Sequence, residues 1–288
     1  MKQNIKLDSS NLKILVCCHK KCDLPDDDVF LPVHVGAAIS DEDLGIQRDD
    51  RCGGMPCDNI SDKNKSYCEL TAIYWAWKNI RKIYPGIEYI GVNHYRRYFL
   101  FTKISRRITS IDFKSMADIN TPIVPEKIKL DGDTIITYRK VFLSKPVFIK
   151  YCVAHISDDY RILKNAVEKL YPDYYGSFIN VFEKNDIFYP CNMFIMPWSI
   201  FDKYCEWLFT ILKEVESKSN YKTYNPVQQR VFGYIAERML GVFIYHNKLK
   251  NIGYPAAFIN PKTEGTVHRN SWQDIIKQGL RSIRNAVS

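Results

Sequence analysis

The chain lacks the marks of several common protein classes. It has no run approaching ~18 consecutive apolar residues, about the length that a helix needs to cross a bilayer. Residues 1–10 are polar and contain no apolar signal-peptide core, so a cytoplasmic location is expected. Neither G-x-G-x-x-G nor G-x-x-x-x-G-K-[ST] occurs, which argues against a Rossmann dinucleotide site and a P-loop NTPase.

Cysteines at metal-binding spacing are also missing. The chain has nine cysteines, an odd number that would leave one unpaired in a secreted protein. Most lie in apolar patterns, which is typical of buried free thiols in a reducing cytosol. A zinc site at Cys22, Cys52 and Cys57 is the less favoured alternative, because Cys52 and Cys57 are not spaced as C-x-x-C and no histidine follows at finger spacing.

Size and charge allow one large domain with an acidic partner. The 288 residues are 46% hydrophobic and 14% aromatic, enough for a sizeable core. The formal net charge is +9 and the pI is about 9.0. A nucleic acid, an anionic membrane surface and a nucleotide-sugar all fit that sign, and the charge does not choose among them.

Apolar periodicity predicts an α/β protein. In the first third we expect strands at 12–18, 32–39 and 89–92, a long loop at 41–66, and a helix from residue 66 to Pro85-Gly86. This order favours a βαβ arrangement. Further along, the patterns predict strands at 134–138 and 193–196, and helices at 146–171, 200–215, from 226 through 242, and 271–287.

The most informative segment follows the expected strand at 89–92. Asn93, His94, Tyr95, Arg96 and Arg97 come in a row where that strand should leave the sheet. Ligands bind outside the carboxyl ends of strands in open α/β sheets. Two adjacent guanidinium groups there predict a site for an anionic, phosphate-bearing ligand. A solvated basic turn is the alternative.

Several blocks resemble a family of bacterial capsule and O-antigen biosynthesis proteins that includes galactofuranosyltransferases. The blocks are Asn64, Tyr67-Cys-Glu-Leu-Thr71, Tyr74-Trp75, Trp77-Lys-Asn79, His94-Tyr-Arg-Arg-Tyr-Phe99, His155 with Asp159, Tyr171-Pro172, Asn192-Met-Phe-Ile-Met196, Tyr204-Cys-Glu-Trp-Leu-Phe209, and Arg230 with Gly233 and Ala236-Glu-Arg238. His19-Lys20 and residues 32–36 fit the family's opening. The likeness spans roughly residues 12–249, is weak over 121–145, and ends near residue 250.

The resemblance implies a GT-A-like single α/β domain over residues 1–250. Its central sheet would be mixed and mostly parallel, with a helical C-terminal part and a C-terminal extension at 251–288. The implied activity is transfer of a hexose, with galactofuranose the expected sugar, from a UDP-sugar donor to a lipid-linked oligosaccharide acceptor. The residues expected to bind substrate are His19, Lys20, Asn64, Glu69, Thr71, His94, Tyr95, Arg96, Arg97, Asn192, Arg230 and Arg238.

Such a transferase must neutralise a diphosphate and deprotonate an acceptor hydroxyl. Many GT-A enzymes use a divalent metal, Mn²⁺ or Mg²⁺, held by an Asp-x-Asp, but no carboxylate stands at residues 93–95. We therefore favour Arg96 and Arg97 for the diphosphate. A metal bound with the help of His94 is the alternative, with further carboxylates from Asp49, Asp50, Asp58 or Asp62.

The expected base is a carboxylate or a histidine near the acceptor hydroxyl. Asp159 and Glu237 are the main candidates, and His155 is a weaker one. A continuous helix would bring His155 and Asp159, four residues apart, onto one face. Structural roles for both carboxylates remain the alternatives, as a helix-surface contact or an internal ion pair with Arg238.

Two other function classes fit parts of the sequence. A non-catalytic basic protein could bind an acidic glycan or nucleic acid, but the basic residues are scattered and no nucleic-acid module occurs, so a nucleic-acid partner is not expected. A membrane-tethered scaffold could use the basic amphipathic segment Trp272–Val287 for peripheral contact with the inner face of the membrane. That segment could equally pack on its own domain.

Overall fold

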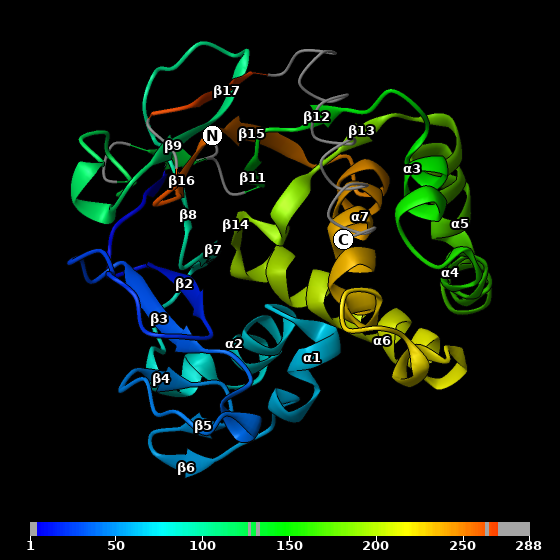
Figure 1. The fold of residues 1–288 in the computed structure, drawn as a ribbon, viewed down its shortest axis with the longest axis horizontal. Coiled ribbons are helices and arrows are strands. Elements are labelled where there is room, and N and C mark those ends of the chain that lie inside the picture. Colours follow the sequence, from blue (N-terminus) through cyan, green and yellow to red (C-terminus); the bar gives the residue numbers. More distant parts are fainter. Residues whose placement is uncertain (1–4, 126–127, 131–132, 263–264, 270–288) are drawn as a thin grey trace.

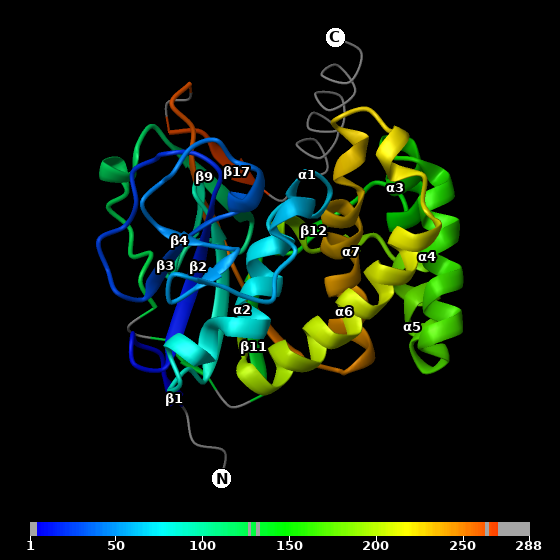
Figure 2. The same cartoon turned by 90° about the horizontal axis from the view of Figure 1, so that it is seen from below.

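The protein is described by a computed structural model that covers residues 5–125, 128–130, 133–262 and 265–269. A mixed eleven-stranded sheet forms its centre, and helices cover one face of that sheet (Figures 1 and 2). The predicted α/β class is confirmed. Among the described residues, no helix is both long and apolar enough to cross a membrane.

The sheet combines parallel and antiparallel pairs. Parallel pairing joins β4 (Gln47–Arg48), β3 (Phe30–His34), β2 (Leu12–Cys18) and β7 (Tyr89–His94) in that order. Antiparallel β14 (Phe194–Pro197) lies between β7 and β11 (Thr134–Tyr138). The remaining strands of the sheet are β8 (Arg97–Phe99), β9 (Ile108–Phe113), β15 (Lys250–Tyr254), β16 (Ala256–Ile259) and β17 (Val267–Arg269).

Small pairs and helices complete the fold. Outside the central sheet, β1 (Ile5–Lys6) pairs with β10 (Lys129–Leu130), β5 (Arg51–Cys52) with β6 (Met55–Pro56), and β12 (Val141–Phe142) with β13 (Ile187–Phe188). The α-helices are α1 (Asn64–Tyr67), α2 (Leu70–Ile83), α3 (Val147–Ala154), α4 (Ser157–Leu170), α5 (Pro172–Ile179), α6 (Trp198–Lys218) and α7 (Val231–His246).

The alternation of side chains along β7 divides the core into two parts. Ile90 and Val92 face the helices and pack with α2, α6 and α7, whereas Tyr89 packs in the core on the opposite face. Gly91 lets the strands approach closely, because a Cβ there would lie 2.9 Å from a side-chain carbon of Ile195 and 3.0 Å from one of Ile14. The sheet is therefore buried on both faces, as its apolar strands predict.

Several predicted boundaries were wrong. The expected strand at 32–39 is β3, which ends at His34 because Gly36 turns the chain with a φ of 71°. The expected strand at 89–92 continues to His94 and forms a hairpin with β8. The helix expected from residue 226 begins at Val231, since the Asn225 side chain accepts the N–H groups of residues 227 and 228 in a turn.

The helix expected at 146–171 is two helices. Residue His155 has an extended backbone, with φ −136° and ψ 177°, and ends α3. A new helix, α4, starts at Ser157 with Asp158 and Asp159 in its first turn, where acidic side chains favour a helix start. His155 and Asp159 therefore do not share one helix face.

Residue 250 is not a boundary of the domain's sheet. Strand β15 starts there and pairs in parallel with β11 over five residues, and β16 pairs with both β8 and β9. The C-terminal extension proposed for 251–288 thus contributes strands to the central sheet in its described part. The predicted amphipathic helix at 271–287 lies outside the described residues.

Candidate functional site

The carboxyl ends of the parallel strands meet at one edge of the sheet. His19 and Lys20 follow β2, Gly36 follows β3, and His94 ends β7. Because β14 runs antiparallel to β7, its first residues lie at this edge too, and Asn192 stands two residues before the strand. The N-terminal half of α7 packs against this segment. Chain segments far apart in sequence thus converge at the edge where α/β folds bind ligands.

A cationic cluster lies on the outer side of this edge, around the ring of Tyr95. The His19 ring meets the Tyr95 ring edge-on at 4.9 Å between centroids. Lys20 Nζ and Arg96 Cζ lie 5.8 and 5.1 Å from the same ring centroid. Burial lowers the pKa of His19, and the positive charges of Lys20, Arg96 and Arg230 lower it further. The structure therefore gathers five of the predicted ligand-binding residues, including Arg230 from the residue before α7.

Beneath this cluster lie His94 and Arg97. The His94 ring is 9% exposed, and its Nε2 lies 2.6 Å from the carbonyl oxygen of Cys191. Burial lowers the pKa of His94, whereas the negative charge of Glu69 raises it. The Arg97 guanidinium lies 5.2 Å over the Phe258 ring, and its buried Nε has no hydrogen-bond partner within the described part of the chain. His94 Nε2 is thus engaged by the Cys191 carbonyl, while the Nε–H of Arg97 can still donate a hydrogen bond.

Two carboxylates hold the strained segment that precedes β14. Cys191 and Asn192 both have left-handed backbones, with φ of 73° and 47°, a conformation that costs non-glycine residues about 1–3 kcal/mol each. Glu237 Oε1 accepts the Cys191 N–H at 2.9 Å, and Glu69 Oε1 accepts Asn192 Nδ2 at 2.6 Å. Asn192 Nδ2 also donates to the Gly233 carbonyl at 3.3 Å. These bonds connect α2, α7 and the start of β14.

Glu237 holds its proton more readily than a solvated carboxyl group does. Burial raises the pKa of Glu237, and the charge of Glu69 raises it further, whereas Arg238 and Arg97 lower it. Its side chain retains 23% exposure, and Arg238 Nη1 lies 3.4 Å from Glu237 Oε2. The carboxyl group is therefore partly accessible to solvent. Its pKa reflects a balance between burial and Glu69, which raise it, and the two arginines, which lower it.

Arg238 itself is held from several sides. Its guanidinium donates to the Tyr234 carbonyl at 2.6 Å and lies over the rings of Tyr151 and Phe188 at 5.2 and 5.0 Å. Burial lowers the pKa of Arg238. Arg238 thus lies beneath the site as a partner of Glu237, apart from the cationic cluster.

Asn64 and Thr71 shape the junction between α1 and α2. Asn64 Nδ2 donates to the Cys68 carbonyl at 2.8 Å and to Thr71 Oγ1 at 3.2 Å. Cys68 has a φ of 53°, and its Sγ accepts Arg230 Nε at 3.3 Å. The side chains of Asn64 and Thr71, predicted to touch substrate, are therefore engaged within the protein and orient Glu69 and Arg230.

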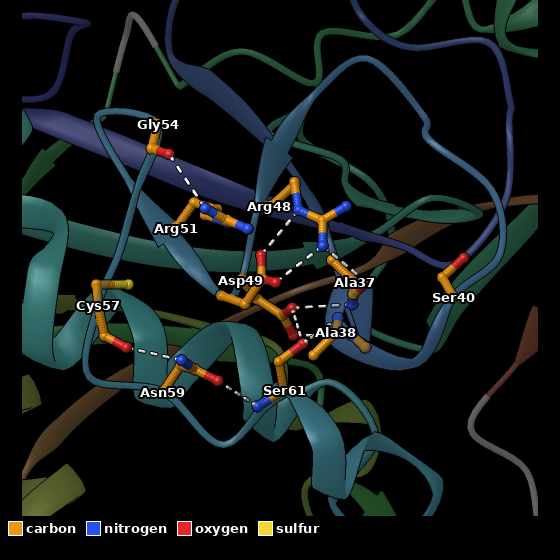
Figure 3. Close-up of polar contacts among 12 residues, drawn as sticks. Ala37, Ala38, Ser40, Arg48, Asp49, Arg51, Gly54, Cys57, Asn59 and Ser61 are labelled. Atoms are coloured by element: carbon orange, nitrogen blue, oxygen red, sulfur yellow. Dashed lines mark hydrogen bonds and ion pairs between the residues drawn. The ribbon is translucent and has the colours of Figure 1, made fainter.

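The turn after β3 is closed by Asp49 rather than left open for an anion. Asp49 is fully buried, and its carboxylate accepts the N–H groups of Gly36 and Ala37 at 2.8 and 3.1 Å (Figure 3). Ser61 Oγ donates to the same carboxylate and accepts the Ala38 N–H at 3.0 Å. The N–H groups that could cradle a phosphate at this turn are all occupied.

Two other loop carboxylates, Asp50 and Asp58, also have partners within the protein. Asp50 accepts two hydrogen bonds of 2.8 Å from the Arg48 guanidinium. Asp58 accepts the hydroxyl of Tyr74 at 3.1 Å. Within the described ranges, no group of three His, Cys, Asp or Glu side chains is placed to hold a metal ion.

Asp159 and His155 occupy different surroundings. Asp159 is buried, and its Oδ1 accepts hydroxyl groups from Ser219 at 2.7 Å and Tyr224 at 3.0 Å. Burial raises the pKa of Asp159, and these two hydrogen bonds oppose the rise. Asp159 therefore links α4 to the segment between α6 and α7.

His155 lies closer to the cationic cluster. Its ring stacks on Tyr234 at 4.0 Å, and the Arg230 guanidinium lies 5.6 Å from the same Tyr234 ring. Gln228 Oε1 is 3.3 Å from His155 Nδ1. Burial lowers the pKa of His155 to about 4. The ring is therefore neutral at physiological pH and acts as an aromatic neighbour of the site.

Sequence reasoning singled out Asn192 in the segment that connects these groups but missed its neighbour Cys191. Cys191 contacts both His94 and Glu237 through its backbone, and Gly233 admits the Cys68 side chain, since a Cβ there would lie 3.3 Å from Cys68 Sγ. Pro190 just before a buried strand was the available signal for a turn at this point.

Comparisons with known proteins agree with this architecture. A solved structure described as the WbbM bifunctional glycosyltransferase in its apo form is similar, with a TM-score of 0.75 and 29% sequence identity. The match covers 89% of this chain but only 46% of that one. No curated protein matches. A family profile matches residues 13–248, most of the chain, and the chain therefore belongs to the family described as "Domain of unknown function (DUF4422)".

Proposed function

We propose that this protein is a glycosyltransferase that moves a hexose from a UDP-sugar to a lipid-linked glycan during synthesis of a bacterial capsule or O-antigen. The cationic cluster of His19, Lys20, Arg96 and Arg230 carries the proposal, because it lies at the carboxyl edge of the sheet in a glycosyltransferase-like fold. Galactofuranose is the proposed sugar, on the strength of the sequence resemblance. The proposed location is cytoplasmic, at the inner face of the membrane where a lipid-linked acceptor would lie.

The diphosphate of the donor is assigned to the arginines. Transfer of the sugar breaks its bond to the diphosphate, and negative charge develops on the leaving oxygen. Arg96 and Arg230 are exposed and positively charged, so they can bind the phosphoryl oxygens through charge-assisted hydrogen bonds. Arg97 adds a third guanidinium, which is more buried than the other two. Binding of this kind requires no metal, and a Mn²⁺- or Mg²⁺-dependent reaction is the alternative.

Glu237 is the proposed base. Its carboxyl group has a raised pKa, and its side chain is 23% exposed. It accepts the N–H of Cys191, the residue whose carbonyl oxygen contacts His94. A carboxylate with a raised pKa accepts the proton of an attacking hydroxyl more readily than an ordinary one. Glu69 orders Asn192 beside it and is proposed as a positioning residue. Asp159 is less suited, because its accepting oxygen already binds two hydroxyl groups.

Thermal unfolding with a panel of ligands tests the proposal. The panel contains UDP, UDP-galactose, UDP-galactofuranose, GDP and CMP, each with Mn²⁺ or with EDTA. A ligand present at ~100 times its Kd adds roughly 2.7 kcal/mol of stability, so uridine diphosphates should raise Tm selectively. Persistence of the rise in EDTA supports the arginines, whereas its loss supports the metal.

The matched variants are Arg96→Ala and Arg107→Ala. Arg107 is an exposed arginine in the loop before β9. Loss of the UDP response in Arg96→Ala alone is the expected result. No response of the wild-type protein to any uridine nucleotide would contradict the proposed function.

A further inference from the structure

Exposed apolar side chains gather at one end of the helical part. Nine large hydrophobic residues are exposed among those described, and five of them lie in two short segments. These are Phe142, Ile149, Val153 and Ile156 in and around α3, and Val227 before α7, with exposures of 37%, 36%, 71%, 37% and 59%. We call these five residues the α3 face. Scattered exposed apolar residues are ordinary, but a gathered set marks an interaction surface.

The α3 face is the outer side of an otherwise well-packed helix. Val147 and Tyr151 are buried in the core on the inner side of α3. Ile149 and Val153 are four residues apart and lie on the opposite side, one turn above the other. Lys150 lies on the flank of the helix, between the two sides, and is half-buried. The helix thus has a packed face and a solvent-facing apolar face with a basic residue beside it.

Hydrogen bonds bring the second segment to the end of α3. Gln228 Nε2 donates to the Ala154 carbonyl at 2.9 Å, and Gln228 Oε1 meets the His155 ring. Val227, adjacent to Gln228, therefore lies beside the C-terminus of α3. The exposed apolar residues form one region that spans two separate parts of the chain.

Basic residues lie beside this region. Lys140 and Lys145 are exposed on the segment that leads into α3, and Lys140 Nζ lies 5.6 Å from the Phe142 ring. Two carboxylates lie in the neighbouring segments: Asp158 on α4, which is paired with Arg161 at 3.5 Å, and the partly exposed Asp186, whose backbone carbonyl accepts the Leu143 N–H at 2.8 Å. An apolar surface with a basic rim is complementary to an anionic bilayer, where acyl chains lie beneath negative headgroups.

The α3 face also adjoins the candidate site. His155, at the end of α3, stacks on Tyr234, and Arg230 lies over the same Tyr234 ring. Figure 2 shows α1 and α3 at the same end of the molecule. A surface in contact with the α3 face would therefore lie near Arg230 of the cationic cluster.

We propose that the α3 face docks the protein onto an anionic lipid bilayer. Ile149, Val153 and Val227 enter the interface between headgroups and acyl chains, and Lys145 and Lys150 bind the headgroups. The docking needs no donor nucleotide and does not depend on the transfer reaction, so failure of one proposal leaves the other standing. It also does not require the segment Trp272–Val287.

Sedimentation with lipid vesicles tests the docking surface. The full chain is mixed with phosphatidylcholine vesicles that contain or lack phosphatidylglycerol, without any nucleotide. Wild-type protein should sediment with the anionic vesicles only. The double variant Ile149→Glu/Val153→Glu should lower the partition coefficient by roughly tenfold or more, because two apolar side chains no longer enter the interface. Each Lys→Glu change at Lys145 or Lys150 should lower it at least about fivefold.

Two further variants distinguish the α3 face from other surfaces of the chain. Met55→Glu alters a side chain of similar exposure, 69%, on the distant β5–β6 hairpin and should bind as the wild type does. Ile275→Glu/Ile276→Glu alters the C-terminal segment, and loss of binding in this variant alone would overturn the proposal. So would equal binding of the α3 variant and the wild type. Sedimentation velocity is the last measurement, and it compares the oligomeric state of the wild type with that of Ile149→Glu/Val153→Glu. If the wild type forms dimers, the variant is monomeric and vesicle binding is unchanged, the α3 face binds a second copy of the chain and the proposal is overturned.

Discussion

Substitution of Asp49 by Asn should destabilise the protein strongly, although Asp49 lies in a loop-rich segment. The Asp49 carboxylate accepts two backbone N–H groups and one hydroxyl in a fully buried position. Hydrogen bonds to a charged group contribute about 1.5–3 kcal/mol each. Asn retains one carbonyl oxygen for Ala37 and Ser61, but its amide group would face the Gly36 N–H, donor against donor. We expect the free energy of unfolding to fall by ~2–4 kcal/mol.

Urea unfolding measures this loss, with Asp43→Asn as the control. Asp43 makes a similar bond to the N–H of Gly45, but in an exposed loop, so its substitution should cost less than ~1 kcal/mol. A metal-holding role for Asp49 predicts a different result: activity would be lost with little change in stability. An Asp49→Asn protein within about 1 kcal/mol of the wild type would refute the reasoning from hydrogen bonds.

Three further substitutions test the site residue by residue. Arg97→Ala should lower kcat/KM for the UDP-sugar by on the order of 10²-fold, because one guanidinium no longer stabilises the leaving diphosphate, and Arg107→Ala should leave it unchanged in the same assay. Glu237→Gln should lower kcat by roughly 10²–10⁴-fold while UDP affinity persists, and the acid limb of the wild-type pH–rate profile should lie above the ordinary pKa of 4.5, since burial raises it. His155→Phe should lessen the loss of stability between pH 6.5 and about 4 in urea unfolding, because the unfolded chain protonates His155 at 6.5 whereas the folded protein keeps it neutral to about 4.

The sequence predicted those elements whose stability follows from local patterns. Helix α2 repeats apolar residues at spacings of three and four, and β2 and β7 are short apolar runs bounded by polar turns. Residues 93–97 stand out for the same reason, because they place charge directly after a buried strand. Local patterning therefore identified the edge of the sheet and several of the cations found there.

Patterning failed where exposed apolar residues continued a helical period. Val153 and Ile156 fit one apolar stripe with Tyr160 and predicted a single helix, yet Val153 is 71% exposed and Ile156 follows the end of α3. The break thus moved His155 and Asp159 into separate surroundings. Val153 and Ile156 also belong to the α3 face. The exposed apolar residues that misled the helix prediction are therefore among those of the proposed docking surface.

Tertiary contacts determine the rest of the site. The His94 ring binds a carbonyl group 97 residues away, and Arg230 meets Cys68 across 162 residues. Cys191 adopts a left-handed backbone in the turn before β14, although cysteine does not favour that conformation, and Asn192, a residue type enriched in it, follows. Glu69 and Glu237 stabilise that turn through hydrogen bonds that no local pattern predicts. Pairings of this kind follow from the fold and not from any short segment.

A crystal structure of the protein soaked with UDP tests the central claim most directly. We expect diphosphate density within hydrogen-bond distance of Arg96 and Arg230, next to Lys20, at the carboxyl edge of β2 and β7. The competing position is the cavity of about 470 Å³ that Arg48 and Arg51 help to line. Density for the diphosphate in that cavity, and none beside Arg96, would contradict the assignment of the diphosphate to the cationic cluster.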